Sequence, residues 1–399
     1  MASARAQPVS STVAASAAMG PRQGATPHRM QTLLAQLRVQ DWRPGQLEAI
    51  EALTCQRRDT WLSLPCGGGK SLVFAAAMHV LGGAGILVEP LQAIAALMKP
   101  YLRDRGIEAE TLTAKTRAAT LLRLCRPRSK TARPFVVIAS PEELLHADVL
   151  QALQPPAGAF DVSAVRARCA RGELQPKCPV SLLAIDEAHV VLAWGETFRP
   201  LLAQMSQVLR ALQSWPSCAV LKLAMTATAT PQRREAVKKC LEFKPGSCDV
   251  LRSLRRSNVQ LEFRVPVGKA ETHQPQQKFA AVLAMLRQEP ALSAMLIFVN
   301  SRRDADRIAT GLESKVHNEF GVGGAVHAYH AKLPGARKDR LRDEFVRVAT
   351  GCGKDGDVRV LVATIAFGLG VDIHGLHTVV VWDMPASVTD TYQMARHSP

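Results

Sequence analysis

Short apolar segments alternate with longer segments of helical period along most of this chain, and the alternation limits its fold more than any other feature. Five apolar segments come first, at 60–64, 85–89, 135–139, 181–185 and 219–224. Segments of helical periodicity separate them, at 71–80, 91–103, 198–213 and 231–243. Strands that are apolar throughout, with helices between them, are typical of a parallel sheet covered on both faces. The pattern therefore predicts an α/β fold.

A second series of apolar strands follows, after a stretch rich in polar and turn residues. Its members lie at 295–299, 325–330, 358–363 and 377–382, again with helical segments between them. A chain of 399 residues is also longer than one hydrophobic core usually accommodates. The sequence predicts two tandem α/β domains, at 30–250 and 275–399, joined by a linker at 251–274.

Two further segments do not follow the alternation. Residues 151–180 contain four prolines and lack clear periodicity, which predicts a surface insertion in the first domain. The first acidic residue is Asp41, and residues 1–29 are rich in Ala, Ser and Arg. That composition favours a disordered tail, and it also fits an organellar transit peptide.

The net charge of the chain is strongly positive. Lys and Arg number 50 against 34 Asp and Glu, which gives a formal charge of +16 and a pI near 9.8. Such a balance predicts a polyanionic partner, although a generally basic surface would give the same count. No apolar run is long enough to cross a bilayer, so we expect a soluble protein with no membrane partner. Nine cysteines without a C-x-x-C pair predict reduced thiols and no zinc site.

The segment LPCGGGKS, at 64–71, follows the first strand and opens a helix. Such a position is the context that a phosphate-binding loop requires. Gly67, Gly68 and Gly69 would let backbone N–H groups approach phosphates at the positive end of the helix. Lys70 would meet the β- and γ-phosphates of a nucleotide, and Ser71 would hold Mg²⁺. Leu64 stands where the common pattern has its first glycine.

The segment IDEAH, at 185–189, ends another apolar strand. Asp186 is placed to hold Mg²⁺, directly or through water, and Glu187 can polarise an attacking water. His189 is expected to couple this acidic pair to the rest of the protein, and a surface histidine is the alternative. An acidic pair at a strand end gains weight because a phosphate-binding loop lies upstream.

In the order and spacing of its motifs the chain resembles the superfamily 2 helicases, and the RecQ family in particular. DWRPGQ (41–46) resembles the adenine-recognition motif, with Arg43 and Gln46 at the matching places and Val39 where the family has an aromatic residue. The segments 182–200, 224–230, 297–309 and 361–372 resemble helicase motifs II to V. The resemblance covers roughly residues 40–393 and implies two RecA-like domains that use ATP and Mg²⁺.

The resemblance also implies where nucleic acid would bind. Trp194, Phe198 and Arg199 match an aromatic-rich loop that senses DNA, since an aromatic on a polar loop can stack on a base; a core tryptophan is the alternative. Other expected nucleic-acid contacts follow strands of the second domain: Asn300, Ser301, Arg302 and Thr364. His330 is either a further functional residue or an ordinary residue at a strand end.

The carboxyl end of the sequence departs from the family. The family has a Gly-Arg-Ala-Gly-Arg run after the Tyr-Gln of motif VI, whereas here Tyr392-Gln393 is followed by Met-Ala-Arg-His-Ser-Pro. On this basis we expect a second domain truncated at motif VI. We also expect the arginine that reaches the γ-phosphate to be absent, and Arg396 not to replace it.

The expected function is that of an ATP-dependent 3′→5′ DNA helicase that translocates on single-stranded or branched DNA. The resemblance further implies repair and recombination in the nucleus. A mitochondrial or plastid location would follow if the acid-free N-terminus is a transit peptide. Two alternatives remain open: an RNA helicase of the DEAD/DEAH type, and a hydrolysis-deficient pseudo-helicase that binds ATP and DNA.

Overall fold

The computed structural model of the 399-residue chain gives a detailed description of most of the sequence. The described residues are 27–65, 67–90, 92–125, 132–155, 178–189, 201–215, 219–228, 230–254, 259–260, 262, 274–288, 294–364, 367, 373, 375–384 and 394.

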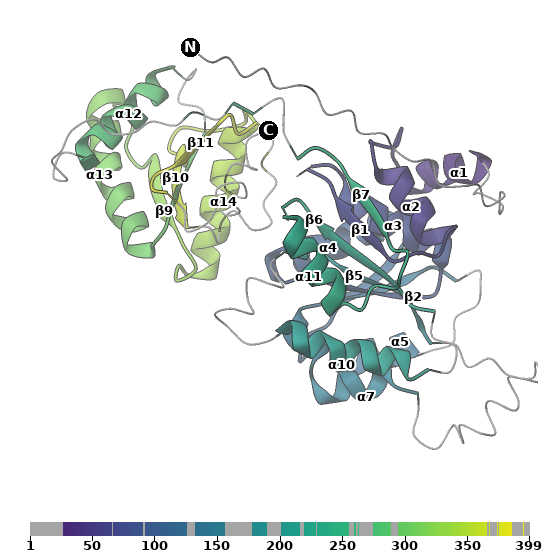
Figure 1. Ribbon diagram of the computed structural model, residues 1–399. Coiled ribbons are helices and arrows are strands. Elements are labelled where there is room, and N and C mark those ends of the chain that lie inside the picture. Colours follow the sequence, from purple (N-terminus) through teal and green to yellow (C-terminus); the bar gives the residue numbers. More distant parts are fainter. Residues whose placement is uncertain are drawn as a thin grey trace, which may run out of the picture.

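The first domain is built on a seven-stranded sheet in which every pairing is parallel (Figure 1). Its strands are β1 (Thr60–Ser63), β2 (Ala84–Val88), β3 (Glu108–Thr111), β4 (Phe135–Ala139), β5 (Val180–Ile185), β6 (Leu221–Thr226) and β7 (Cys248–Leu251). Their order across the sheet is β3-β4-β2-β5-β6-β1-β7. Every residue of β1, β2, β4 and β6 is buried, as expected for strands covered on both faces.

Helices cover both faces of this sheet, because successive strand residues point to opposite sides. Leu62 and Leu87 pack into one core, together with buried residues of α1 (Pro27–Leu37), α2 (Gln46–Thr54), α3 (Lys70–Leu81) and α4 (Gln92–Asp104). Trp61 and Ile86 pack into the other core. That second face is covered by α5 (Arg117–Cys125), α6 (Pro141–Leu144), α7 (Ala147–Leu153), α10 (Leu201–Gln213) and α11 (Pro231–Cys240).

The second domain has a four-stranded parallel sheet in the order β11-β8-β10-β9. Its strands are β8 (Met295–Val299), β9 (Val326–Tyr329), β10 (Val360–Thr364) and β11 (Thr378–Val381). Alternate residues of β8 again enter two cores: Ile297 packs with α12 (Gln274–Gln288) and α13 (Arg302–Phe320), and Phe298 packs with α14 (Gly335–Ala349). The predicted α/β fold with two parallel sheets is confirmed.

Several details differ from the sequence-based expectation. The strands β3 and β7 were not predicted, and β7 carries the first sheet to Leu251, into the predicted linker. The insertion expected at 151–180 is too long at both ends, because α7 continues to Leu153 and β5 begins at Val180. Residues 156–177 lie outside the described part of the chain.

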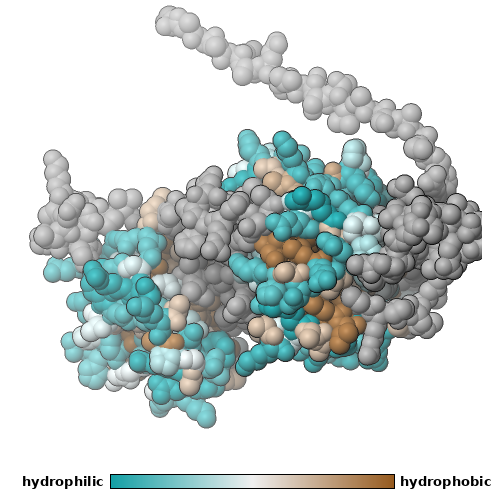
Figure 2. Space-filling view, turned by 90° about the horizontal axis from the view of Figure 1, so that it is seen from below, coloured by the Kyte–Doolittle hydropathy of each residue, from teal (hydrophilic) through white to brown (hydrophobic). Residues whose placement is uncertain are grey.

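Figure 2 presents one face of the molecule. The described residues on this face are mostly hydrophilic, with smaller apolar areas between the polar ones. Among the described residues, no helix combines the length and the apolar character needed to span a bilayer.

Candidate functional site

Three of the predicted motifs meet at one edge of the first sheet. The strands β5, β6 and β1 are neighbours, and all run in the same direction. Ser63 at the end of β1 is in register with Thr226 at the end of β6, and Ile185 of β5 pairs with Ala224. Because β1 and β5 are two strand spacings apart, the loops that follow them begin about 10 Å from each other. The phosphate-binding loop and the acidic pair therefore share the carboxyl edge of the sheet.

The predicted phosphate-binding loop turns tightly into α3. Gly67 and Gly69 have φ angles of 72° and 78°, in the left-handed region that glycine adopts without strain. Gly69 is the residue before the helix, and Lys70 and Ser71 are its first two residues, both partly exposed. Gly68 lies between these two glycines, Gly67 and Gly69, and its backbone N–H donates to the carbonyl of Pro65 at 2.9 Å. The loop thus places the positive end of a helix beside a lysine, an arrangement that favours the binding of phosphate.

Arg43 and Gln46 contact this loop directly. The Gln46 amide nitrogen donates to the carbonyl oxygens of Gly68 and Gly69, at 3.0 and 3.2 Å. Its amide oxygen accepts from the backbone N–H of Arg43 at 2.8 Å. The guanidinium of Arg43 donates to the carbonyl of Gly67. The two residues that the sequence assigned to the nucleotide are therefore in place beside the loop, but they bind its backbone.

The acidic pair follows β5 and is buried. Asp186 is 8 % exposed and Glu187 is 7 % exposed. The N–H of Glu187 donates to the Asp186 Oδ1 at 2.8 Å, and the N–H of Asp186 donates to the carbonyl of Val88 at 3.0 Å. Glu187 has a φ of 45°, a left-handed conformation that costs a non-glycine residue energy and that is often found at functional sites. The turn holds both carboxylates at the sheet edge.

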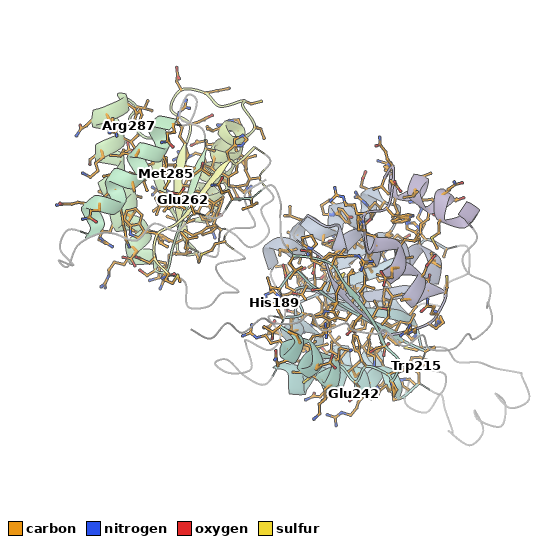
Figure 3. The ribbon with its side chains drawn as sticks, turned by 45° about the horizontal axis from the view of Figure 1, so that its top comes forward. His189, Trp215, Glu242, Glu262, Met285 and Arg287 are labelled. Atoms are coloured by element: carbon orange, nitrogen blue, oxygen red, sulfur yellow. The ribbon has the colours of Figure 1, made fainter. Side chains whose placement is uncertain are left out.

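His189 connects this pair to β6. Its Nδ1 lies 2.8 Å from the Thr226 hydroxyl and 3.4 Å from the Glu187 Oε2. The Thr226 hydroxyl donates to the carbonyl of Thr228 at 3.1 Å and accepts from the Thr228 N–H at 3.0 Å. The Thr226 hydroxyl therefore contacts both the His189 ring and the backbone of Thr228. Figure 3 shows His189 at the opposite end of the first domain from Trp215.

The residues at this edge fit a magnesium nucleotide. Ser71 and Asp186 supply the hydroxyl and carboxylate oxygens that Mg²⁺ prefers. A methyl group added at Gly67 would meet nothing within 4 Å, so the loop is open on that side. Lys70 adds a positive charge beside that opening.

One acidic residue at this edge was missed by the sequence analysis. Glu89 directly follows β2 and is fully buried. Because Val88 is in register with Ile185, Glu89 and Asp186 occupy neighbouring positions on adjacent strands. An acidic residue directly after an apolar strand was visible in the sequence, and the same signal led to the prediction of Asp186.

The expected nucleic-acid contacts of the second domain lie at the carboxyl edge of its sheet. Thr364 ends β10 in register with Val299, the residue before Asn300. The Asn300 amide donates to the carbonyl of Met384 at 3.1 Å, and Asn300 itself is exposed. Ser301 caps α13, since its hydroxyl accepts from the N–H of Asp304 at 3.1 Å, and Arg302 is exposed. The structure thus brings Asn300, Ser301, Arg302 and Thr364 together.

Of the remaining predicted residues, the structure describes His330. Trp194, Phe198, Arg199 and Arg396 lie outside the described residues. His330 lies at the end of β9, with its Nε2 at 3.2 Å from the Asp306 Oδ1. That contact holds the ring against α13 and favours a structural role.

Comparisons with known proteins agree with this geometry. Residues 43–237 match the DEAD/DEAH box helicase family, and residues 277–396 match the helicase conserved C-terminal domain. The ATP-dependent DNA helicase RecQ of Pasteurella multocida is 25 % identical over 354 residues, which are 89 % of this chain and 47 % of that protein. The chain spans about half the length of this protein and of the RecQ helicases of Bacillus subtilis and Haemophilus influenzae, which it also matches.

Solved structures share the tandem arrangement of the two domains. The Mycobacterium smegmatis helicase Lhr, bound to ssDNA and AMP-PNP, aligns with a TM-score of 0.63 and 20 % identity over 94 % of this chain and 46 % of that one. Dbp5 of S. cerevisiae, bound to RNA and ADP BeF3, aligns with a TM-score of 0.61 and 16 % identity over 94 % and 84 %. With two RecA-like domains, two matching helicase domains and RecQ proteins among its relatives, the chain belongs to the RecQ-type superfamily 2 helicases.

Proposed function

We propose that this chain is the motor of an ATP-dependent DNA helicase, which couples ATP hydrolysis to translocation on single-stranded DNA. The observation that carries the proposal is the contact between His189 and Thr226, 2.8 Å long and fully buried. It ties the acidic pair to β6, the strand directly beside the one that leads into the phosphate-binding loop. A structural change at the loop or at the acidic pair would therefore be transmitted to the other.

The side chains divide the chemistry among them. Lys70 and the N–H groups of the loop neutralise the β- and γ-phosphates. Mg²⁺, when bound by Ser71 and Asp186, neutralises further phosphate charge. The Glu187 carboxylate orients the attacking water and accepts its proton, which is general-base catalysis. The contact between the His189 Nδ1 and the Thr226 hydroxyl holds the turn around Glu187 in place.

DNA binding is proposed for two groups of residues. The first is the sheet-edge group Asn300, Ser301, Arg302 and Thr364, whose amide, hydroxyls and guanidinium suit backbone phosphates. The second is the loop with Trp194, Phe198 and Arg199, proposed to stack on exposed bases. The net charge of the whole chain is +16, which favours the binding of a polyanion.

The finer points of the activity follow from the RecQ relationship. We propose 3′→5′ translocation, single-stranded or branched DNA as substrate, and a role in repair and recombination. We also propose a nuclear location, with a mitochondrion or plastid as the alternative. A fluorescent fusion at the carboxyl end would decide the location, because a fusion at the other end would mask a transit peptide.

The test is ATP turnover measured with single-stranded DNA, with RNA of equal length, and without nucleic acid. We expect stimulation by DNA, and no turnover in Lys70→Ala, which lacks the loop cation. Stimulation by RNA alone would identify an RNA helicase. Binding of ATP and DNA without turnover above the Lys70→Ala background would identify a pseudo-helicase.

A further inference from the structure

Two segments enter the first sheet side by side at its amino edge, opposite the edge that carries the acidic pair. Segment 55–59 leads into β1, and segment 239–247 leads into the neighbouring strand β7 (Figure 1). The N–H of Lys244 donates to the Asp59 Oδ2 at 2.8 Å, and the guanidinium of Arg58 donates to the carbonyl of Ser247 at 3.0 Å. These hydrogen bonds join the two segments into one surface, the amino-edge surface.

The amino-edge surface carries an excess of positive charge. Its exposed cations are Arg57, Arg58, Lys239 and Lys244. The two segments contain two acidic residues, and one of them, Asp59, is fully buried and paired with Lys222 at 3.1 Å. Glu242 is exposed and is the remaining acidic residue. Four exposed cations against this one exposed anion leave an excess of three positive charges.

These cations are not neutralised by carboxylates. Elsewhere in the first domain cations are paired, as Lys99 and Arg123 are with Glu110. Within the described part of the chain, none of the four cations of the amino-edge surface forms an ion pair. The contacts given for Arg57 and Arg58 are with carbonyl and amide oxygens. Because like charges held close together repel one another, such a surface favours the binding of an anion.

The backbone of Arg57 gives a second, independent indication. Its φ is 56°, in the left-handed region that glycine adopts without strain. The guanidinium is nevertheless exposed, and the contact given for it is a long one, 3.5 Å, to the carbonyl of Ala219. Strained residues other than glycine are concentrated at functional sites, and Glu187 is one in this chain. The strain at Arg57 therefore favours a use for its side chain.

The composition of the surface indicates the kind of partner. Protein interfaces are anchored by apolar and aromatic side chains. The large exposed apolar residues of the described chain all lie outside the two segments: Leu97, Leu122, Leu251 and Met384. The one aromatic residue of the two segments, Phe243, packs against the hydrophobic core and does not offer a face on which unpaired bases could stack. A DNA duplex needs neither kind of anchor, because its phosphates face outward.

We propose that the amino-edge surface binds the phosphate backbone of double-stranded DNA. The four residues of β1 separate it from the phosphate-binding loop by about 13 Å, so the duplex and the nucleotide occupy different sites. The proposal rests on the proposed function, because it gives a DNA helicase a place for the duplex arm of a branched substrate.

The test is the affinity of the full chain for a blunt-ended DNA duplex, measured by fluorescence anisotropy without nucleotide over a range of salt concentrations. Each phosphate contact contributes about 0.9 to the slope of log affinity against log salt. The triple variant Arg57→Gly, Lys239→Gln, Lys244→Gln should lose about 3 from that slope, and about tenfold or more in duplex affinity at about 0.1 M salt. Its affinity for single-stranded DNA should stay within about twofold of the unmodified chain. Arg58 is kept, because its hydrogen bonds hold the two segments together.

The matched control removes three exposed cations from other places: Arg38→Gly, Lys315→Gln and Lys354→Gln. Arg38 has the same left-handed backbone as Arg57, with a φ of 57°, but its guanidinium is paired with Asp104 at 2.8 Å. The control should keep the duplex affinity and the salt slope. Arg57→Gly alone should keep or raise the melting temperature, because glycine relieves the strain, so a loss of affinity in that variant is not a loss of folding.

Equal losses in the triple variant and the control would show that net charge binds the duplex, and would overturn the proposal. An equal loss for duplex and single-stranded DNA would also overturn it, as would a failure of the unmodified chain to bind the duplex at low salt. Failure of the proposed function is distinguishable, because duplex binding is measured without ATP turnover. If the function holds, the triple variant should keep the turnover that single-stranded DNA stimulates.

Discussion

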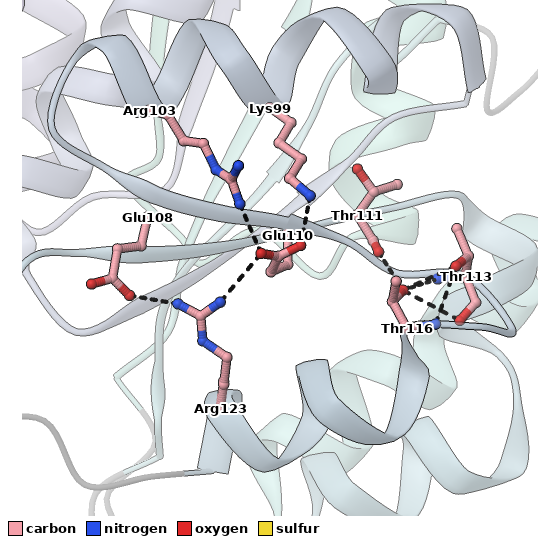
Figure 4. Close-up of polar contacts among 8 residues, drawn as sticks. All are labelled: Lys99, Arg103, Glu108, Glu110, Thr111, Thr113, Thr116 and Arg123. Carbon is pink, nitrogen blue, oxygen red and sulfur yellow. Dashed lines mark hydrogen bonds and ion pairs between the residues drawn. The ribbon is translucent and has the colours of Figure 1, made fainter.

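Two acidic clusters of the first domain differ in their surroundings. At the carboxyl end of β5, Asp186 and Glu187 are buried, and their contacts include a backbone N–H and the ring of His189. On the edge strand β3, Glu108 and Glu110 lie among cations from α4 and α5 (Figure 4). Both clusters look alike in sequence, as two acidic residues near a strand.

The cations around β3 neutralise its carboxylates. Glu110 pairs with Lys99 at 2.7 Å, with Arg103 at 2.8 Å and with Arg123 at 3.3 Å. Burial by itself would raise the pKa of the Glu110 carboxyl, but the Lys99 hydrogen bond and the three positive charges outweigh it and hold that pKa below its usual range. The charged side chains also shield the open edge of the sheet from pairing with another chain. The β3 cluster is therefore structural, whereas the β5 cluster is placed at the phosphate-binding loop.

The largest expected effect separates the two clusters by catalysis. Glu187→Gln should slow ATP hydrolysis by about 10²–10⁴-fold, because an amide can bind a water but cannot accept its proton. ATP affinity should persist, since Asp186 and Ser71 still hold the metal. Steady-state ATPase and a filter-binding assay measure the two quantities.

Glu110→Gln is the matched control for that experiment, with the same substitution in the other cluster. It should hydrolyse ATP at the wild-type rate. Equal losses in both variants would mean that the assay reports folding, and would remove the distinction between the clusters.

The next effect concerns the bond that holds the β5 cluster. Thr226→Val preserves shape but removes the hydroxyl, so the buried His189 ring and the Thr228 N–H both lose their hydrogen-bond partner. We expect a loss of about 2 kcal/mol in the free energy of unfolding, and slower turnover. Urea denaturation measures the first quantity. Thr226→Ser should restore both, and a fully stable Thr226→Val protein would show that the contact contributes nothing.

The contrast also shows what sequence can predict. The central strands were found because a strand covered on both faces must be apolar throughout, as in Phe135–Ala139 and Met295–Val299. The edge strand β3 was missed, because its sequence Glu-Ala-Glu-Thr meets solvent and cations on its open side. β7, with Asp249 in the middle, was missed for the same reason.

At the site, residue types were predictable but their partners were not. Local spacing in the sequence is enough to recognise the glycines, Lys70 and the acidic pair. The bond from Gln46 to Gly68 joins residues 22 positions apart, and that from His189 to Thr226 joins residues 37 positions apart. Such pairs form only after the sheet assembles, so no local pattern specifies them. For Gln46 the partner in the structure is the backbone of the phosphate-binding loop.

A smaller effect is the pH-dependent stability given by Glu110. Because its folded pKa lies below the unfolded value of about 4.3, its contribution is complete above that pH and is lost as the pH falls through the folded value. Glu110→Gln should cost about 1 kcal/mol at pH 7 and less at pH 3, below the unfolded pKa. Urea denaturation at both pH values measures this, and a pH-independent cost would point to lost packing instead.

The smallest effect belongs to Glu108 and sharpens the account of the β3 cluster. Glu108 pairs with Arg123 at 2.7 Å, and both side chains are more than one-third exposed. Exposed pairs gain little, because water screens the charges and ordering two long side chains costs entropy, so Glu108→Gln should cost about 0.3 kcal/mol. Arg123 also contacts Glu110. Without the Glu108 carboxylate, the Arg123 guanidinium should pair more strongly with Glu110, which would reduce the cost of Glu108→Gln further. A double-mutant cycle of Glu108→Gln with Glu110→Gln measures this coupling. Costs that simply add would show that Arg123 serves the two carboxylates independently.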